Sequence, residues 1–235
     1  MTGSVLLVGG SSEIGMAVLL RLLGPASRDV ILAGRPSPEL ARNVEKLRDA
    51  GYPVSTLQYD ATADAALDQG KLNAMLDQAC VERPVELAIV AVGSMSDTSF
   101  AEGLTVNGTA VALLLRALVR RQPEQVVLLS SAAAVRPRES IAAYSLGKQL
   151  ADSTALLLGR QSGVPVLVVR PGFVTTRMTA GLPKPPLATN PEHVAGRVAA
   201  AVEAHKSIVW VPGGMGLAVR LLSLVPRKLL PAGWR

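Results

Sequence analysis

The stretch Val5–Gly15, VLLVGGSSEIG, decides the fold class. Val5–Val8 is an unbroken apolar run, as expected of a buried parallel strand, and helical periodicity follows over Met16–Leu23. Glycines between a strand and a helix let the backbone turn tightly, and the free N–H groups and helix dipole favour a pyrophosphate. The alternative is a turn that serves packing alone. The residues predicted to bind a dinucleotide here are Gly9, Ser11, Ser12, Glu13, Ile14 and Gly15.

The same alternation of strands and helices continues along the chain. Further strands are predicted over 29–33, 54–59, 85–92, 126–130, 164–170 and 208–211. Helices are predicted over 37–50, 61–69, 71–82, 100–121, 143–159 and 190–204, and 173–189 is predicted to be a loop over a cleft. This order indicates a single-domain α/β protein with a doubly wound parallel sheet over residues 1–213. Residues 214–235 are predicted to form an apolar-basic helical tail.

Composition excludes several classes of function. Among 235 residues, Cys80 is the single cysteine, which rules out a disulfide framework and a cysteine-based zinc site. The chain has two histidines, so no metal site is expected. We find no signal-peptide pattern and no apolar run of about 18–20 residues, and therefore expect a cytoplasmic protein.

The net charge of +6 is concentrated toward the C-terminal end. No acidic residue follows Glu203, whereas basic residues stand at 206, 220, 227, 228 and 235. Three interpretations of the tail stay open: peripheral contact with the inner face of a membrane, closure of a substrate cleft, or a contact in a homo-oligomer. No nucleic-acid motif accompanies the charge, so nucleic acid is not expected as a partner.

Polar residues follow two of the predicted strands. Arg35 comes after strand 29–33, where an acidic residue would bind the ribose hydroxyls of NAD and an arginine accommodates a 2′-phosphate. NADP(H) is therefore the favoured cofactor and NAD(H) the alternative. Asp60 follows strand 54–59 and is interpreted either as a partner of the adenine amino group or as a helix cap.

Residues 130–148, SSAAAVRPRESIAAYSLGK, contain the candidate catalytic residues. Ser131 follows a buried strand, and Tyr144 and Lys148 are four residues apart, so they share one helix face. A phenol with a pKa of about 10 is a poor acid near neutral pH, and a neighbouring ammonium lowers that pKa. Ser131 would then bind a carbonyl oxygen and Tyr144 would transfer the proton. The alternative is a strand-end cap with an ordinary surface pair.

Two further features point to the same region. Asn107 and Gly108 are poor helix residues inside the long helical pattern 100–121, and such a fault can mark a functional site. Arg136 and Arg138 lie between Ser131 and Tyr144, where they could hold a substrate phosphate or simply solvate the surface.

In this order, the motifs resemble the short-chain dehydrogenase/reductase family over residues 4–212. The resemblance implies a Rossmann-type fold and NAD(P)H-dependent reduction of a ketone, with Ser131 thirteen places before Tyr144. It also implies that Asn107 holds a water leading to Lys148, and that Val174 and Thr176 contact the nicotinamide carboxamide. Gly93, Pro171 and Gly172 complete the implied cofactor site. Departures are Val8 for a threonine, Glu13 for a glycine, and Val90-Ala91-Val92-Gly93 for Asn-Asn-Ala-Gly.

A narrower similarity is to the actinobacterial decaprenylphosphoryl-2-keto-pentose reductases, in GGSSEIG, VRPGFVTTRMTAGL and the IVWVP strand. It implies a polyprenyl-phosphate 2-keto-pentose substrate, a product used for cell-wall arabinan, and a flavin oxidase partner. The alternatives are a reductase of another lipid or polyketide ketone, and a non-catalytic dinucleotide-binding sensor.

Overall fold

The computed structural model describes residues 3–24, 28–79, 83–95, 99–217 and 219. Within these ranges the strands form one seven-stranded parallel sheet in the order β3-β2-β1-β4-β5-β6-β7. The strands are β1 Ser4–Val8, β2 Val30–Gly34, β3 Val54–Gln58, β4 Val85–Val90, β5 Gln125–Leu129, β6 Val166–Pro171 and β7 Ile208–Val211. The strand order reverses between β1 and β4, which is where open α/β sheets bind ligands. The predicted fold class is confirmed.

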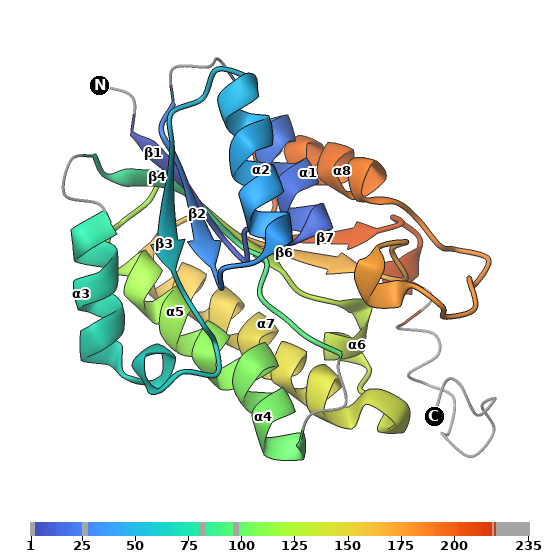
Figure 1. The fold of residues 1–235 in the computed structure, drawn as a ribbon. Coiled ribbons are helices and arrows are strands. Elements are labelled where there is room, and N and C mark those ends of the chain that lie inside the picture. Colours follow the sequence, from blue (N-terminus) through green and yellow to red (C-terminus); the bar gives the residue numbers. More distant parts are fainter. Residues whose placement is uncertain (1–2, 25–27, 80–82, 96–98, 218, 220–235) are drawn as a thin grey trace.

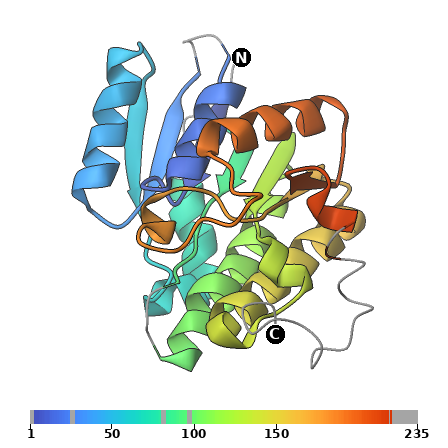
Figure 2. The ribbon, with the colours of Figure 1, turned by 90° about the vertical axis from the view of Figure 1, so that its right-hand side faces the viewer.

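Helices cover both faces of the sheet (Figures 1 and 2). One layer contains α1 Glu13–Leu22, α2 Pro38–Asp49 and α8 Pro191–Glu203. The other contains α3 Gln69–Ala79, α4 Phe100–Leu104, α5 Ala110–Val119 and α7 Ala142–Ser162. Alternate side chains of a strand point to opposite faces of the sheet. In β1, Leu6 and Val8 pack against the layer of α5 and α7, whereas Val5 and Leu7 pack against the layer of α1.

Local sequence explains where the helices begin. The Ser37 hydroxyl accepts a hydrogen bond from Leu40 N (3.1 Å) before α2, and Asn190 accepts one from His193 N (2.8 Å) before α8. Each of these two helices also has proline at its first position. The expected helix 61–69 is instead the short 3₁₀ turn η1, Asp64–Leu67.

Some features differ from the sequence expectations. The helix 100–121 is interrupted by a π-helical segment, η2 Thr105–Thr109, between α4 and α5. A one-turn helix, α6 Ala132–Val135, follows β5, and 3₁₀ turns occur at η3 Glu139–Ile141 and η4 Arg177–Thr179. Most of the predicted tail helix, 218 and 220–235, lies outside the described residues.

One described helix, Phe100–Val119, is long and apolar enough to cross a membrane by length and composition, contrary to the expectation that no such run exists. Half of that stretch is buried in the molecule, and α5 contributes Leu114, Leu115 and Leu118 to the core. A core helix passes the same test, and this burial indicates one.

Candidate active site

The glycine turn after β1 brings three strands' ends together. Gly9 has a φ of 94°, and a Cβ there would stand 2.6 Å from the carbonyl oxygen of Ala91, so both conformation and space require glycine. A Cβ on Gly15 would stand 2.8 Å from the Ala91 side chain. The Ser12 hydroxyl accepts a hydrogen bond from Gly15 N (3.1 Å) and starts α1. The amino end of α1 therefore lies at the switch point of the sheet.

A cavity of about 760 Å³ opens at this switch point. Its size is within the range of about 300–1,000 Å³ typical of small-molecule sites. The predicted cofactor residues that line it are Gly9, Ser11, Ser12, Glu13, Ile14, Arg35, Asp60, Gly93 and Thr176. Gly15, Pro171, Gly172 and Val174 do not line it, and neither do Asn107, Ser131, Tyr144 and Lys148.

Asp60 lies at the cavity wall and forms hydrogen bonds within its own turn. It lines the cavity, and its carboxylate also accepts hydrogen bonds from the main-chain N–H (2.9 Å) and hydroxyl (2.8 Å) of Thr62. Burial alone would raise the pKa of Asp60, but these bonds and the charge of Arg35 lower it below its usual value. The carboxylate caps a local turn and does not cap η1, which begins after Ala63.

Lys148 and Asn107 both lie against the same side of Gly93. Lys148 is buried, and its ammonium donates hydrogen bonds to the carbonyl oxygens of Val92 (2.8 Å) and Leu129 (2.9 Å). A Cβ on Gly93 would stand 3.0 Å from both Asn107 Oδ1 and Lys148 Nζ. Burial lowers the pKa of Lys148 to about 8, against the opposing charge of Asp152. Lys148 therefore joins the ends of β4 and β5 at the edge of the sheet.

Asn107 lies in the π-helical segment that interrupts the long helix. Its amide nitrogen donates to the carbonyls of Ser94 and Gly103 (both 2.9 Å), and Oδ1 accepts from Ser94 N (2.9 Å). One acceptor position of Oδ1 is left for a further donor. The irregularity that the sequence predicted within this helix is therefore confirmed. Short π-helical segments inside α-helices often occur at functional sites.

Tyr144 and Ser131 meet above β5. Ser131 begins α6 by accepting a hydrogen bond from Ala133 N (3.1 Å), and its hydroxyl is close enough to Tyr144 to act on the pKa of the phenol. Burial raises the pKa of Tyr144, while the Ser131 hydroxyl and the charge of Arg138 oppose that rise. We expected Lys148, whose Nζ stands 5.9 Å from the Tyr144 ring centre, to lower this pKa, but the pKa is raised, because burial outweighs the effects of Ser131 and Arg138.

The segment after β6 closes on itself beside the cavity. Gly172 N donates to Val211 O (2.8 Å), and a Cβ on Gly172 would stand 2.6 Å from the end of the Met215 side chain. Val174 is buried in the core on the α1 side, whereas Thr176 reaches the cavity. Thr175 N donates to Thr189 O (2.8 Å), which closes a compact loop rather than an open lid.

The two arginines between Ser131 and Tyr144 are half-buried. Arg136 Nη1 is buried and finds no hydrogen-bond partner among the residues that the structure describes. Arg138 is close enough to Tyr144 for its charge to act on the phenol. Neither position is typical of a charge that only solvates a surface, because such a guanidinium is hydrated.

Comparison with known proteins agrees with this geometry. A family model described as the KR domain matches residues 3–176. An uncharacterized oxidoreductase of Streptomyces coelicolor is 33% identical over 96% of this chain and 94% of its own. The chain belongs to the short-chain dehydrogenase/reductase family.

Other members of the family are similar along almost the whole chain. An uncharacterized oxidoreductase of Mycobacterium tuberculosis H37Rv is 34% identical over 95% of this chain and 94% of its own. Among solved structures, a short-chain dehydrogenase of Sphingobium yanoikuyae in complex with NADPH superposes with a TM-score of 0.75 at 21% identity, covering 99% and 100% of the two chains. A single-site variant of the actinorhodin polyketide ketoreductase with NADPH gives 0.75 at 20% identity, covering 92% and 99%. These structures show the same fold.

Sequence reasoning missed several residues of this dehydrogenase/reductase site. Arg177, Glu39 and Tyr59 line the cavity, and the Tyr59 hydroxyl is buried with no partner in the described part of the chain. Asp152 stands one turn beyond Lys148. The i,i+4 spacing from Lys148 was the available signal for Asp152, whereas no local pattern marks Arg177. Within the described ranges, no group of three or more His, Cys, Asp and Glu residues lies close enough to hold a metal ion.

Proposed function

We propose that this protein is an NADPH-dependent reductase that converts a ketone to a secondary alcohol. The observation that carries the proposal is the placing of Ser131, Tyr144 and Lys148 at the carboxyl edge of the sheet, next to a cavity of about 760 Å³ at the switch point. A dinucleotide fits the residues present: glycines allow close approach, and the amino end of α1 faces the cavity.

Ser131 and Tyr144 have separate roles in the proposed carbonyl reduction. When bound, a reduced nicotinamide supplies the hydride. Ser131 Oγ donates a hydrogen bond to the carbonyl oxygen, and Tyr144 Oη gives that oxygen its proton. Because burial raises the pKa of Tyr144, the phenol keeps its proton at neutral pH and gives it up only as negative charge develops on the carbonyl oxygen.

Lys148 acts on the phenolate that remains after the transfer. Its ammonium is held by two carbonyl oxygens, and its charge favours an anion nearby. The free acceptor position on Asn107 Oδ1 supports the proposed water between Asn107 and Lys148, by which Tyr144 regains a proton from solvent.

NADPH is the proposed cofactor because Arg35 follows β2 at the cavity wall. Two structures with the same fold were solved with NADPH, which supports the proposal. NADH remains the alternative.

The proposed substrate is a ketone that carries an anionic group, and the finer candidate is a polyprenyl-phosphate 2-keto-pentose. An anion at this position is supported by Nη1 of Arg136, which has no hydrogen-bond partner within the described residues, and by the charge of Arg138 beside Tyr144. Such a substrate would place the protein in the cytoplasm next to the membrane, with a flavin oxidase as the source of the ketone. The tail proposed to contact the membrane lies outside the described residues.

A second candidate is the reduction of a polyketide or terpenoid ketone. It is favoured by weaker relatives: 1-deoxy-11-beta-hydroxypentalenate dehydrogenase of Streptomyces exfoliatus is 28% identical over 89% of this chain, and a granaticin polyketide synthase putative ketoacyl reductase is 26% identical over 74%. Incubation with each ketone class and NADPH, following the absorbance of the reduced nicotinamide, separates the two.

Replacement of Tyr144 by phenylalanine tests the proposed chemistry. Loss of the phenolic proton should lower turnover by about 10²- to 10⁴-fold, as for other general acids. NADPH should still raise the melting temperature of the variant, because the phenol does not line the cavity. Unchanged turnover would remove Tyr144 from the mechanism, and no thermal shift with either cofactor in the wild type would reject dinucleotide binding.

A further inference from the structure

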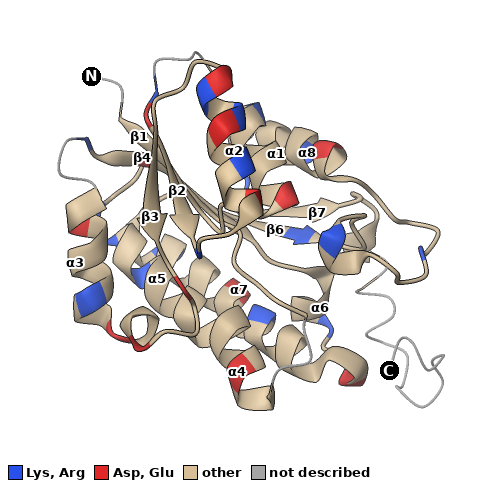
Figure 3. Cartoon of the chain, in the orientation of Figure 1, with Lys and Arg blue, Asp and Glu red and all other residues tan. Residues whose placement is uncertain are grey.

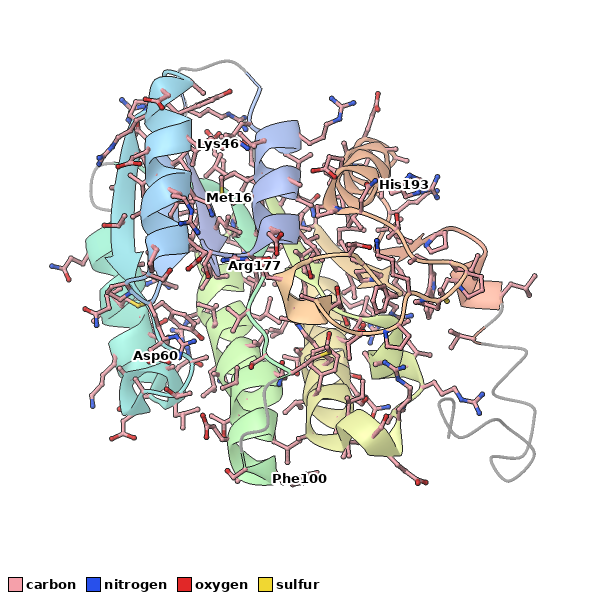
Figure 4. All side chains as sticks on the ribbon, turned by 45° about the vertical axis from the view of Figure 1, so that its right-hand side comes forward. Met16, Lys46, Asp60, Phe100, Arg177 and His193 are labelled. Carbon is pink, nitrogen blue, oxygen red and sulfur yellow. The ribbon has the colours of Figure 1, made fainter. Side chains whose placement is uncertain are left out.

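Arg177 connects the loop after β6 to the glycine turn. It begins η4, directly after Thr176, and lines the cavity (Figure 4). Its main-chain N–H and Nε both donate to Glu13 Oε2, at 2.7 and 3.3 Å, and Nη2 donates to the carbonyl oxygen of Ser11 at 2.6 Å. The guanidinium therefore lies over the glycine turn at the amino end of α1, where a phosphate is expected to bind.

A second carboxylate holds the other side of the guanidinium. Arg177 Nη1 stands 2.9 Å from Glu39 Oε1, and Glu39 lies in the first turn of α2. Glu13 and Glu39 are thus two carboxylates at the cavity wall, one at each helix start. Without a cation between them they would repel an incoming phosphate.

We propose that Arg177 binds a phosphate group of the dinucleotide, and that Glu13 and Glu39 hold its guanidinium over the cavity until that phosphate replaces them. The proposal rests on the proposed function, since it requires a dinucleotide in the cavity. The Arg177 side chain is 51% exposed, so its donors are accessible. Exposed ion pairs contribute little free energy, typically about 0–1 kcal/mol, so exchanging carboxylate for phosphate is easy.

The loop does not need this side chain to keep its shape. Thr176 N donates to Thr179 Oγ1 (3.0 Å), and that hydroxyl donates to Val174 O (2.7 Å). Main-chain bonds also join Thr189 N to Phe173 O (2.9 Å). These bonds fix η4 from within, so the contacts of the Arg177 side chain across the cavity are free to serve a ligand.

Cofactor titration of three variants tests the proposal without a ketone present. NADPH binding is measured by the fluorescence of the reduced nicotinamide. Arg177→Met should raise the Kd about tenfold, as expected for a lost hydrogen bond to a charged group. Glu13→Gln should lower the Kd, because it removes a repelling carboxylate and releases Arg177. Arg42→Ala is the matched control: Arg42 also pairs with Glu39 Oε1 (2.8 Å), but it does not line the cavity, and its Kd should not change.

The same titrations with NADH identify which phosphate is bound. Equal weakening of NADPH and NADH by Arg177→Met assigns the diphosphate, and weakening of NADPH alone assigns the 2′-phosphate. The proposal is overturned, and the proposed function left intact, if the Kd of Arg177→Met equals that of the wild type or if the Kd of Glu13→Gln is higher than that of the wild type. If the wild type binds neither cofactor, both fail. If Arg177→Met does not fold, Arg177→Lys takes its place, because lysine keeps the positive charge but lacks the planar guanidinium. The Kd of this variant should be higher than that of the wild type, with binding still measurable.

Discussion

At the residue scale, Asp152 has an unusual position for a carboxylate. It is buried on α7, and it accepts hydrogen bonds from Ser130 Oγ (2.7 Å) and from Nε (3.0 Å) and Nη2 (2.7 Å) of Arg170. Figure 3 shows the strands almost free of charge, and Arg170 in β6 is an exception. The pair joins α7 to β6 one helical turn from Lys148. The charge of Asp152 opposes the lowering of the Lys148 pKa by burial and therefore favours the protonated form of this lysine.

The pH dependence of the reaction should report this arrangement. If the Lys148 ammonium is required, kcat/KM falls as the pH rises through the Lys148 pKa of about 8. Asp152→Asn removes the charge that raises this pKa and leaves Arg170 unpaired. The falling limb should therefore move to lower pH, which a pH–rate profile with saturating NADPH measures.

Two comparisons make that result specific. Asp77→Asn also breaks a carboxylate–arginine pair, with Arg121, but on the surface and away from Lys148. Its falling limb should stay at the wild-type pH. A limb that does not move in Asp152→Asn would show that Asp152 has a packing role only. In the double variant Asp152→Asn with Arg170→Met, the shift should be smaller, because the unpaired guanidinium is gone as well.

At the scale of elements, the contact between α7 and the π-helical segment positions the site. A Cβ on Gly147 would stand 2.7 Å from Asn107 Cβ and 3.1 Å from Gly108 N. A Cβ on Gly108 would stand 2.9 Å from Gly147 Cα. The two backbones approach this closely because both residues are glycine, and the approach brings Asn107 to within reach of the Lys148 turn.

Gly147→Ala should therefore destabilise the protein although alanine favours helices. The methyl group would press on backbone atoms, and overpacking of this kind costs about 1–3 kcal/mol. Gly196 in α8 is the control, because a Cβ there meets nothing within 4 Å. Gly196→Ala should stabilise by roughly 0.5–1 kcal/mol. Urea unfolding measures both, and a stabilised Gly147→Ala would contradict the close contact.

Elements of regular period were predictable from the sequence, and short or irregular ones were not. The inner strands β1, β4 and β5 are continuous apolar runs that are buried on both faces, so their composition and length decide them, whereas the edge strand β3 is largely exposed. One turn of helix, as in α6, has no period to detect, and Ser131 was interpreted as a catalytic residue or a strand-end cap but not as the start of a helix. The π segment was anticipated only as a fault at Asn107 and Gly108, since propensity locates a defect but does not give its geometry.

At the scale of the whole molecule, the site residues that were missed depend on the topology. Arg177 pairs with Glu13 across 164 positions of sequence, and only the parallel order β1-β4-β5-β6 brings their loops to the same edge of the sheet. A sequence pattern reports neighbours along a helix or strand, so it found Tyr144 and Lys148. Contacts between loops need the folded chain.

Assembly is a further property of the whole molecule. Leu146, Leu150 and Leu157 on α7 are 38%, 46% and 47% exposed, and their spacing places them in one stripe on the outer face of this helix. Exposed leucines scattered singly are normal, whereas an aligned row on a long helix favours a helix–helix contact. We therefore expect a homo-oligomer in which this row is covered by a second copy of the chain.

The double variant Leu150→Glu with Leu157→Glu tests this expectation, because two carboxylates in the row would have to lose their water on association. Light scattering after size exclusion should give a lower mass for the variant than for the wild type. Leu67→Glu is the control, because Leu67 is 40% exposed but lies on η1, outside the row on α7. The mass of the Leu67→Glu variant in solution should match that of the wild type. A wild type that is monomeric, or a double variant with unchanged mass, would show that the row does not mediate assembly. Because association stabilises the folded chain by mass action, the melting temperature of the wild type should rise with protein concentration, and the double variant should lose this dependence.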